Sequence, residues 1–574
     1  MHLASLSVEN YRALRSARVS FDQTTVLIGE NDCGKSSLLE ALAIALDPEA
    51  GDAAPRFQPW HFHRTAPRAD APPVGPIRIA LRFCERSPGE WDALADTPLG
   101  GLLRTTTRRL RSLVLDIRAS AAPGPGESVS TWRLRAEGAP RGSVVTRPEA
   151  LAKLRSSNPL IWLHGGGIAG LSGPGPQAPR NHRSLPPETE RLVQRIEQSH
   201  AAILSGTAPD MHAMLDQGFA AAREFIALAA RHLGGQRHNF RLMVAEILDQ
   251  SRAAREGGPA VAAPRFSGST AERIGVLALM AALLSALPDS LDAAAEPLWI
   301  IEDPEAQLHP MTLASVLALV GHINWQKILT TQSGEVLAAQ PLGTLRRLTR
   351  HAGTVREWRV RPNRLSAEDL RRVAYHLRAR RGVASFARCW LLVEGETEFW
   401  LLPEMARIAG HDLAVEGVAC VEFAQCGLPP LIKLARELGI EWHLLTDGDP
   451  AGQTYTKQAS RFLRGDPVER RFTVLPGRDI ESCFYEHGYA PLFQRLAGLG
   501  DGQPSARIIK RAIDLHSKPQ LALELVLAVA AAGSPGVPEP LQRVIDQSIG
   551  LARGSSVTHR MEVDGCAPHG AGVE

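Results

Sequence analysis

The sequence lacks the features that would place it in a membrane, in an oxidising compartment or around zinc. Its seven cysteines are scattered at positions 33, 84, 389, 420, 426, 483 and 566, and no two form a C-x-x-C pair. This spacing excludes a zinc ribbon and a dithiol redox motif, and it favours a reducing compartment. The longest apolar helical stretch, Ile274 to Pro288, is too short to span a bilayer, and the N-terminus has no signal-peptide pattern. We therefore expect a cytoplasmic protein without membrane contact.

The chain also has little net charge, because 64 basic and 61 acidic residues give only +3 at pH 7. Basic residues gather in two stretches, 104–111 and 356–388, a pattern typical of either a nucleic-acid contact or a solvated surface. No internal repeat is present. The HGGG at 164–167 is interpreted as a loop, since no G-x-S-x-G nucleophile motif accompanies it. A length of 574 residues favours about three or four domains.

What the sequence does contain is a glycine-rich phosphate loop. The stretch GENDCGKS at 29–36 follows an apolar strand pattern and precedes a helical pattern that runs to Ala45. In that context, backbone N–H groups and a helix N-terminus bind a phosphate of ATP or GTP. We expect Lys35 to contact the β- and γ-phosphates and Ser36 to hold magnesium. The nucleotide-binding residues predicted in this loop are Gly29, Asn31, Gly34, Lys35, Ser36 and Ser37.

A second half of the nucleotide site is predicted in PLWIIEDPEAQLHP, which begins at Pro297. The apolar strand 298–301 delivers Glu302 and Asp303 to its carboxyl end, where open α/β sheets bind ligands. Glu302 is predicted to hold magnesium directly or through water. Asp303 is predicted to orient or deprotonate the attacking water, a role that carboxylates take in phosphoryl transfer.

Two further stretches agree with a nucleotide site. FSGST places Ser267 and Gly268 at the start of a long amphipathic helix, where they would bind the γ-phosphate of a second molecule's ATP. An ordinary helix N-cap is the alternative reading of that stretch. KILTTQS ends a strand just before Gln332, which we expect to sense the same phosphate.

A separate set of carboxylates follows strands near the C-terminal part of the chain. In VEGETE, Glu394 ends an apolar strand and Glu398 begins a helix, and in TDGDPAG another strand ends at Asp447 and Asp449. Parallel strands would bring these acids together, where they repel unless divalent cations separate them. Oxygen ligands favour Mg²⁺ or Mn²⁺, and two such ions about 3.5–4 Å apart can drive phosphodiester cleavage. Unrelated surface acids are the alternative.

The first 365 residues resemble the ABC-type ATPases of the SMC, Rad50 and RecF group, on GENDCGKS, FSGST, IIEDPE, AQLHP and TTQS. This resemblance implies that two ATPase heads sandwich ATP head to tail. Gln332 stands where the group usually has a switch histidine, and Asp303 is one methylene shorter than the usual glutamate. Both departures predict slow hydrolysis.

VEGETE and DGDPAG are the two hallmark motifs of a Toprim domain, which residues 388–475 resemble. An ABC-type ATPase followed by a Toprim domain resembles the OLD (overcoming lysogenization defect) family of ATP-dependent endonucleases. The resemblance implies an α/β fold with an inserted helical dimerisation region, ATP with one Mg²⁺, and two Mg²⁺ or Mn²⁺ ions at the Toprim site. It adds Glu481 as a metal ligand and Lys518 as a group that stabilises charge on the cleaved phosphate.

The implied partners are DNA and further copies of the chain in a homodimer or larger homo-oligomer, with a helicase or another defence protein as a candidate. The predicted catalytic residues are Glu394, Asp447, Asp449, Lys518 and Asp303, and the predicted metal ligands are Glu394, Glu398, Asp447, Asp449, Glu481, Ser36 and Glu302. The predicted domains are an ATPase N-terminal half at 1–165, a helical dimerisation insertion at 166–258, an ATPase C-terminal half at 259–370, a Toprim nuclease domain at 385–552 and a disordered tail at 553–574.

The leading prediction is therefore a metal-dependent DNA endonuclease that binds and hydrolyses ATP, with anti-phage defence or DNA repair as its candidate role. A DNA clamp that uses ATP only to close a dimer is the alternative. A type II topoisomerase is disfavoured, because none of the five tyrosines lies in a recognisable DNA-breakage domain.

Overall fold

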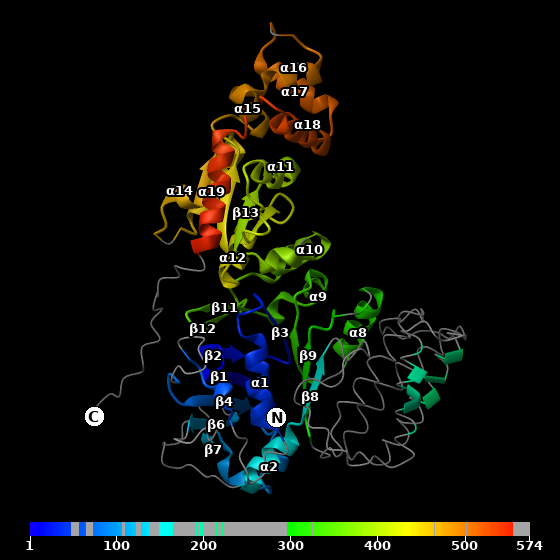
Figure 1. Cartoon of the computed structure of the whole chain (residues 1–574), viewed down its shortest axis with the longest axis vertical. Coiled ribbons are helices and arrows are strands. Elements are labelled where there is room, and N and C mark those ends of the chain that lie inside the picture. Colours follow the sequence, from blue (N-terminus) through cyan, green and yellow to red (C-terminus); the bar gives the residue numbers. More distant parts are fainter. Residues whose placement is uncertain are drawn as a thin grey trace. The chain divides into compact units, whose positions relative to one another are not determined.

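The computed structural model describes most of the chain, in two compact units. One unit comprises residues 1–340 and 344–357, and the other comprises residues 341–343 and 358–574 (Figure 1). The described residues are 1–47, 57–64, 73–105, 110–121, 128–136, 148–164, 295–306, 308, 310–322, 325–380, 382–463, 465–500 and 502–554, with isolated residues between 191 and 221. Ser267, Gly268 and nearly all of the predicted dimerisation region lie outside them and stay predictions.

The first unit is built on a sheet of 12 strands in the order β5-β6-β4-β1-β2-β12-β11-β3-β10-β9-β8, with β7 beside β6. Its strands are β1 His2–Tyr11, β2 Leu14–Ser20, β3 Thr24–Gly29, β4 Ile77–Cys84, β5 Arg104–Thr105, β6 Arg111–Ala121, β7 Ser128–Ala136, β8 Leu160–His164, β9 Leu298–Glu302, β10 Gln326–Thr330, β11 Leu345–His351 and β12 Thr354–Trp358. Strands β8, β9, β10, β3 and β11 run parallel, so their carboxyl ends share one edge.

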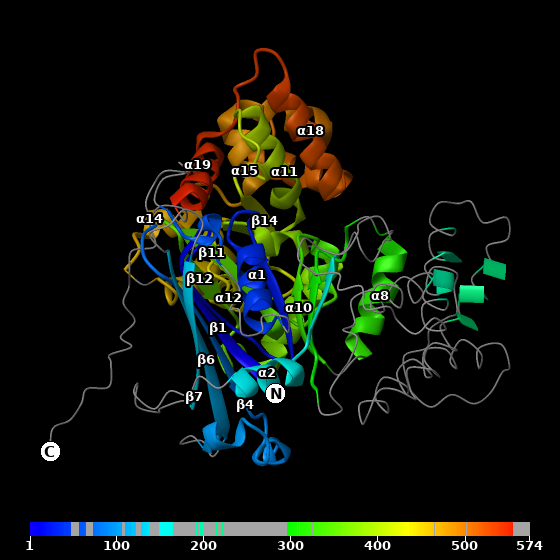
Figure 2. The ribbon, with the colours of Figure 1, turned by 60° about the horizontal axis from the view of Figure 1, so that its bottom comes forward.

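Hydrophobic patterning explains both halves of this sheet. Strands β3 and β10 are buried along almost their whole length, as parallel strands covered on both faces require. The antiparallel strand β4 alternates instead between buried and less buried residues. Figure 2 shows helix α1 lying over the large sheet, where it contacts β1, β3 and β4. The described helices of this unit are α1 Lys35–Leu46, α2 Pro148–Ser157, α8 Pro310–His322 and α9 Gly334–Ala338, with short 3-10 turns at Pro59–His61, Asp92–Leu94 and Gly100–Leu102.

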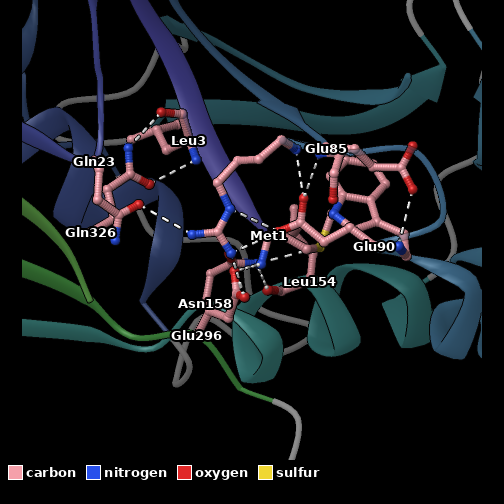
Figure 3. Close-up of polar contacts among 12 residues, drawn as sticks. Met1, Leu3, Gln23, Glu85, Glu90, Leu154, Asn158, Glu296 and Gln326 are labelled. Atoms are coloured by element: carbon pink, nitrogen blue, oxygen red, sulfur yellow. Dashed lines mark hydrogen bonds and ion pairs between the residues drawn. The ribbon is translucent and has the colours of Figure 1, made fainter. Parts of the chain in front are cut away.

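The residues at the start of the chain form hydrogen bonds with Glu296, just before β9, and with Gln326 in β10 (Figure 3). The Met1 ammonium pairs with Glu296 at 2.5 Å, and Arg86 donates to the other oxygen of that carboxylate at 2.9 Å. The Gln326 side chain accepts from the Leu3 amide at 2.8 Å and donates to the Leu3 carbonyl at 2.7 Å. These contacts join the N-terminal strand to β10 and to the segment just before β9, and predicted nucleotide-site residues lie at or just after the ends of β9 and β10.

The second unit contains a parallel sheet of four strands in the order β14-β13-β15-β16. The strands are β13 Cys389–Val393, β14 Val418–Glu422, β15 Glu441–Thr446 and β16 Phe472–Val474. Every residue of β13 is buried, which is why its sequence is continuously apolar. The described helices are α10 Ala367–Arg380, α11 Glu396–Ile408, α12 Leu428–Glu437, α13 Pro450–Ser460, α14 Val468–Arg471, α15 Ile480–Phe484, α16 Ala490–Ala497, α17 Ser505–Leu515, α18 Lys518–Ala530 and α19 Glu539–Gly554, with single turns at Leu342–Thr344, Gly382–Phe386 and Tyr485–Tyr489.

Helices surround this smaller sheet and set up its carboxyl edge. Helices α11 and α19 contact each other and pack on the sheet, and α12 and α13 contact β15 (Figure 1). Helix α18 packs along α11, and the side chain of its first residue, Lys518, lies near Gly395 in the turn between β13 and α11. Within the described part of the chain, no helix is both long and apolar enough to cross a membrane.

Candidate nucleotide and metal sites

The glycines of the phosphate loop are required by its shape. Gly29 and Gly34 have φ of 150° and 99°, values that residues with a side chain rarely adopt. A Cβ on Gly29 would lie 2.4 Å from the Leu348 carbonyl oxygen, and one on Gly34 would lie 2.4 Å from Leu14 Cδ2. The loop therefore keeps its conformation only with glycine at both positions.

Lys35 closes the phosphate loop on itself. The side chain is 6% exposed, and its Nζ donates to the carbonyl oxygens of Gly29 at 2.7 Å and Glu30 at 3.0 Å. Asp32 at the loop tip pairs with Arg350 at 2.6 Å. The Lys35 ammonium also donates to Cys33 Sγ at 3.8 Å. A buried ammonium with these neutral acceptors is well suited to meet the negative charge of a phosphate.

The structure brings Ser36 and Glu302 together, as the sequence predicts. Strand β10 lies between β3 and β9, so the phosphate loop and the end of β9 share one sheet edge. Ser36 Oγ donates to Glu302 Oε1 at 3.0 Å, and Trp162 Nε1 donates to Glu302 Oε2 at 3.2 Å. A hydroxyl beside a carboxylate next to a phosphate loop is a suitable ligand pair for Mg²⁺.

Asp303 lies at the same edge with a strained backbone. Its φ is +46°, its N–H donates to the Thr330 carbonyl at 3.2 Å, and its Oδ1 accepts from Thr330 Oγ1 at 3.2 Å. Burial raises the pKa of Asp303, and the nearby Glu305 and Glu302 carboxylates raise it further. A raised pKa suits a group that accepts a proton from water.

Glu305 is a further residue at this edge, and the sequence motifs did not predict it. Its Oε1 accepts from Thr331 Oγ1 and from the backbone N–H groups of Gln332 and Ser333. The Gln332 side chain itself is exposed. The sequence feature that could have indicated Glu305 is its place as the third acid in EDPE, two positions after Asp303.

In the second unit the predicted carboxylates converge at the carboxyl edge of the small sheet. Glu394 follows β13 and Asp447 follows β15. Burial raises the pKa of Asp447 to about 8, and repulsion from Glu398, Glu394, Asp479 and Glu481 adds to the rise. Carboxylates from three separate motifs therefore lie near enough for their charges to influence one another.

The pKa values of two further acids of this cluster, Glu481 and Glu394, are also raised. Burial raises the pKa of Glu481 to about 7, with Asp479 and Glu398 contributing repulsion. The pKa of Glu394 is raised by burial, then by Asp449 and Glu398. Glu394 Oε2 is buried without a hydrogen-bond partner among the described residues. Carboxylates crowded in this way favour the binding of positive charge beside them.

Lys518 supplies part of that charge. It is the first residue of α18, and a Cβ on Gly395 would lie 3.8 Å from its Nζ and 3.4 Å from Glu398 Oε2. Burial raises the pKa values of Glu394, Glu398 and Glu481, and the Lys518 ammonium opposes part of that rise. The N-terminus of α18 therefore brings Lys518 near the acidic side chains, and its role there stays a prediction.

The DGDPAG loop is too tight for side chains at its glycines. A Cβ on Gly448 would lie 2.3 Å from the Gly477 carbonyl oxygen, and one on Gly452 would lie 2.0 Å from the Asp447 carbonyl oxygen. Asp449 Oδ1 accepts from the Gly452 N–H at 2.7 Å and caps α13. The loop thereby holds Asp447 and Asp449 in fixed positions.

Two residues near the cluster were missed from the sequence. Asp479 caps α15, accepting from Ser482 N at 2.8 Å and Ser482 Oγ at 2.5 Å, and it raises the pKa of Glu481. The Tyr455 ring packs edge-on against Phe423 with centroids 4.9 Å apart. Its pKa is raised by burial, then by Glu394 and Asp449. The position of Asp479, two residues before Glu481, could have indicated its place near the cluster. No sequence feature indicated Tyr455.

The donor chemistry of the cluster fits divalent cations, although the side chains are not yet closed around one. Within the described residues, no three His, Cys, Asp or Glu side chains are arranged to hold a metal ion. The raised pKa values and the unpartnered Glu394 Oε2 mark carboxylates that a cation would relieve.

The pKa of Asp447 predicts a pH-dependent cost to the metal-free fold. Its folded-state pKa of about 8 exceeds the ordinary value of 3.8, so stability present below pH 4 is lost as pH rises towards 8. Because Asp447 is partly exposed, we expect Asp447→Asn to gain ~2 kcal/mol over the wild type at pH 8 in a chelator. At pH 4 the two proteins should match.

Thermal unfolding at both pH values measures this difference, and Mg²⁺ at pH 8 should stabilise the wild type more than the variant. Equal pH dependence in the two proteins would show that Asp447 does not carry the repulsion.

The fold and the two sites define the class of protein: an α/β unit with a phosphate loop, followed by a Toprim domain of the OLD type. Residues 386–449 match the model "Overcoming lysogenization defect protein-like, TOPRIM domain", which confirms the predicted resemblance and the predicted α/β fold class. Residues 1–384 match "Protein of unknown function (DUF2813)", and the chain belongs to this DUF2813 family. It is 33% identical over 573 residues to "Uncharacterized protein YbjD" of Escherichia coli (strain K12), covering 96% of this chain and 100% of that protein.

Solved structures of two kinds are also similar. The C-terminal region of the Burkholderia pseudomallei OLD protein is 18% identical, with 29% of this chain and 99% of that chain covered and a TM-score of 0.26. The Smc head domain of Pyrococcus furiosus bound to the C-terminal domain of ScpA is 13% identical, with 66% and 99% covered and a TM-score of 0.34.

Proposed function

We propose that this protein is an ATP-binding and ATP-hydrolysing DNA endonuclease that depends on divalent metal ions. The observation that carries the proposal is the carboxylate cluster at the edge of the small sheet, where the pKa of Asp447 rises to about 8. A fold gains nothing in stability from crowding acids in this way. Such crowding is typical of a site that binds cations and performs chemistry.

In the Toprim domain, the proposed ligands of two Mg²⁺ or Mn²⁺ ions are Glu394, Glu398, Asp447, Asp449 and Glu481. When bound, the ions supply activated water and stabilise the attacking and leaving oxygens of a phosphodiester. Lys518, whose charge already acts on Glu394 and Glu398, is proposed to stabilise the cleaved phosphate. Tyr455 lies at the side of Glu394 and Asp449, where it would contact the substrate.

In the ATPase unit, Lys35 would exchange its carbonyl partners for the β- and γ-phosphates. Ser36 and Glu302, already 3.0 Å apart, would hold one Mg²⁺, and Asp303 would take the proton of the attacking water. The residues 29–37 would surround the phosphates, and Ser267, Gly268 and Gln332 would complete the site across a homodimer formed through region 166–258.

DNA is the proposed substrate, and anti-phage defence or DNA repair is the proposed setting. A clamp that binds DNA without cutting it is the second candidate, because ATP binding alone could close two heads. The acidic cluster favours the nuclease, since a clamp has no use for a set of repelling carboxylates.

Incubation of supercoiled plasmid with the full chain tests the proposal. We expect nicked or linear DNA with Mg²⁺ or Mn²⁺, and intact plasmid when a chelator is present. The comparison is run with and without ATP, and gel electrophoresis measures the products. Intact plasmid under every metal and nucleotide condition, together with retained DNA binding, would favour the clamp.

A further inference from the structure

Glu305 joins two segments of the nucleotide site that the sequence separates by almost 30 residues. A single oxygen, Oε1, accepts from Thr331 Oγ1 at 2.9 Å, from the Gln332 N–H at 2.7 Å and from the Ser333 N–H at 3.2 Å. These donors form the loop between β10 and α9. The carboxylate therefore holds the loop through two backbone N–H groups and the Thr331 hydroxyl.

The chain conformation after β9 explains why Glu305 reaches this loop. Asp303 adopts a φ of +46°, and the Ala306 N–H donates to the Asp303 carbonyl at 2.9 Å to close a tight turn. Pro304 within the turn is buried. The turn reverses the chain directly after Glu302, the predicted magnesium ligand. It thereby directs the Glu305 carboxylate towards the end of the neighbouring strand β10.

The second carboxylate oxygen of Glu305 takes no part in these hydrogen bonds. Oε2 is buried and has no hydrogen-bond partner among the described residues, and the Glu305 charge raises the pKa of Asp303. A carboxylate is a costly way to satisfy three donors when one of its oxygens is left unpaired. The charge-assisted hydrogen bonds from Glu305 Oε1 to the loop offset this desolvation cost.

We propose that Glu305 is a positioning residue that holds the loop 331–333, and with it Gln332, beside the phosphate site. It acts through this loop on ATP turnover and not on ATP affinity. This role rests on the proposed ATPase function, in which Gln332 senses the γ-phosphate. Glu305 itself touches neither the phosphate loop nor Ser36 in any described contact.

Hydrogen exchange of the full-length, nucleotide-free protein tests the contact without any assay of activity. Glu305→Ala should speed exchange in peptides covering 331–333 by about tenfold or more, because bonds to a charged acceptor are lost. Glu305→Gln keeps an oxygen acceptor and should stay within about threefold of the wild type. Glu335→Ala is the matched control, since Glu335 is an exposed acid at the start of α9.

Steady-state ATP hydrolysis and binding of a fluorescent ATP analogue then separate turnover from affinity. Glu305→Ala should lower kcat by about tenfold while the dissociation constant changes less than about threefold, and Glu305→Gln should restore kcat. Unchanged exchange in Glu305→Ala, or equal losses of affinity and turnover, would overturn the role. A wild type that hydrolyses no ATP would overturn the proposed function instead, and the exchange result would still decide whether Glu305 holds the loop.

Discussion

Asp447→Ala is expected to abolish plasmid nicking while ATP hydrolysis continues at the wild-type rate. Burial raises the pKa of Asp447, and four other carboxylates, Glu398, Glu394, Asp479 and Glu481, raise it further. Removing a shared ligand lowers the charge that retains the metal ions, and the stabilisation of the attacking and leaving oxygens is lost with them. We expect at least a thousandfold fall in cleavage rate, which corresponds to ~4 kcal/mol.

ATP hydrolysis should survive because the phosphate loop, Ser36 and Glu302 belong to the other compact unit. Supercoiled plasmid and released phosphate are measured on the same preparations. Asp514→Ala is a suitable control, because Asp514 is an exposed acid of α17 in the same unit as the cluster. A variant lacking Asp447 that still cuts DNA would place the nuclease site elsewhere.

Lys35→Ala is expected to weaken ATP binding by about a hundredfold or more, in keeping with the loss of charge-assisted bonds to two phosphates. The structure adds a second reason, since Lys35 Nζ donates to the Gly29 and Glu30 carbonyls. Without the ammonium, these carbonyl oxygens would face the phosphates and repel them. Titration with a fluorescent ATP analogue measures the affinity.

Two companion variants sharpen this experiment. Ser36→Ala keeps the ammonium and should mainly weaken the dependence of ATP binding on Mg²⁺, because Ser36 contacts Glu302. Lys153→Ala, on α2 of the same unit, should bind ATP as the wild type does. Wild-type affinity in Lys35→Ala would remove the phosphate-loop assignment.

The sequence determined the local elements of both sites. Glycine spacing in GENDCGKS predicted a phosphate loop, and Gly29 and Gly34 indeed occupy positions where no Cβ fits. Apolar runs ending in acids predicted β9, β13 and β15, which end at Glu302, Val393 and Thr446. These predictions succeeded because burial on both faces of a parallel sheet imposes a pattern on a few consecutive residues.

Only the tertiary structure decided which distant residues meet. The pairing of Ser36 with Glu302 spans 266 positions and depends on β10 lying between their strands, an order that no local pattern encodes. Lys518 lies near Gly395 and acts on the pKa of Glu398, and helix α18, on which it lies, packs along α11. Glu305 and Asp479 were missed for the same reason: an acid in a loop has no period, and its role depends on the donors and charges that the fold brings to it.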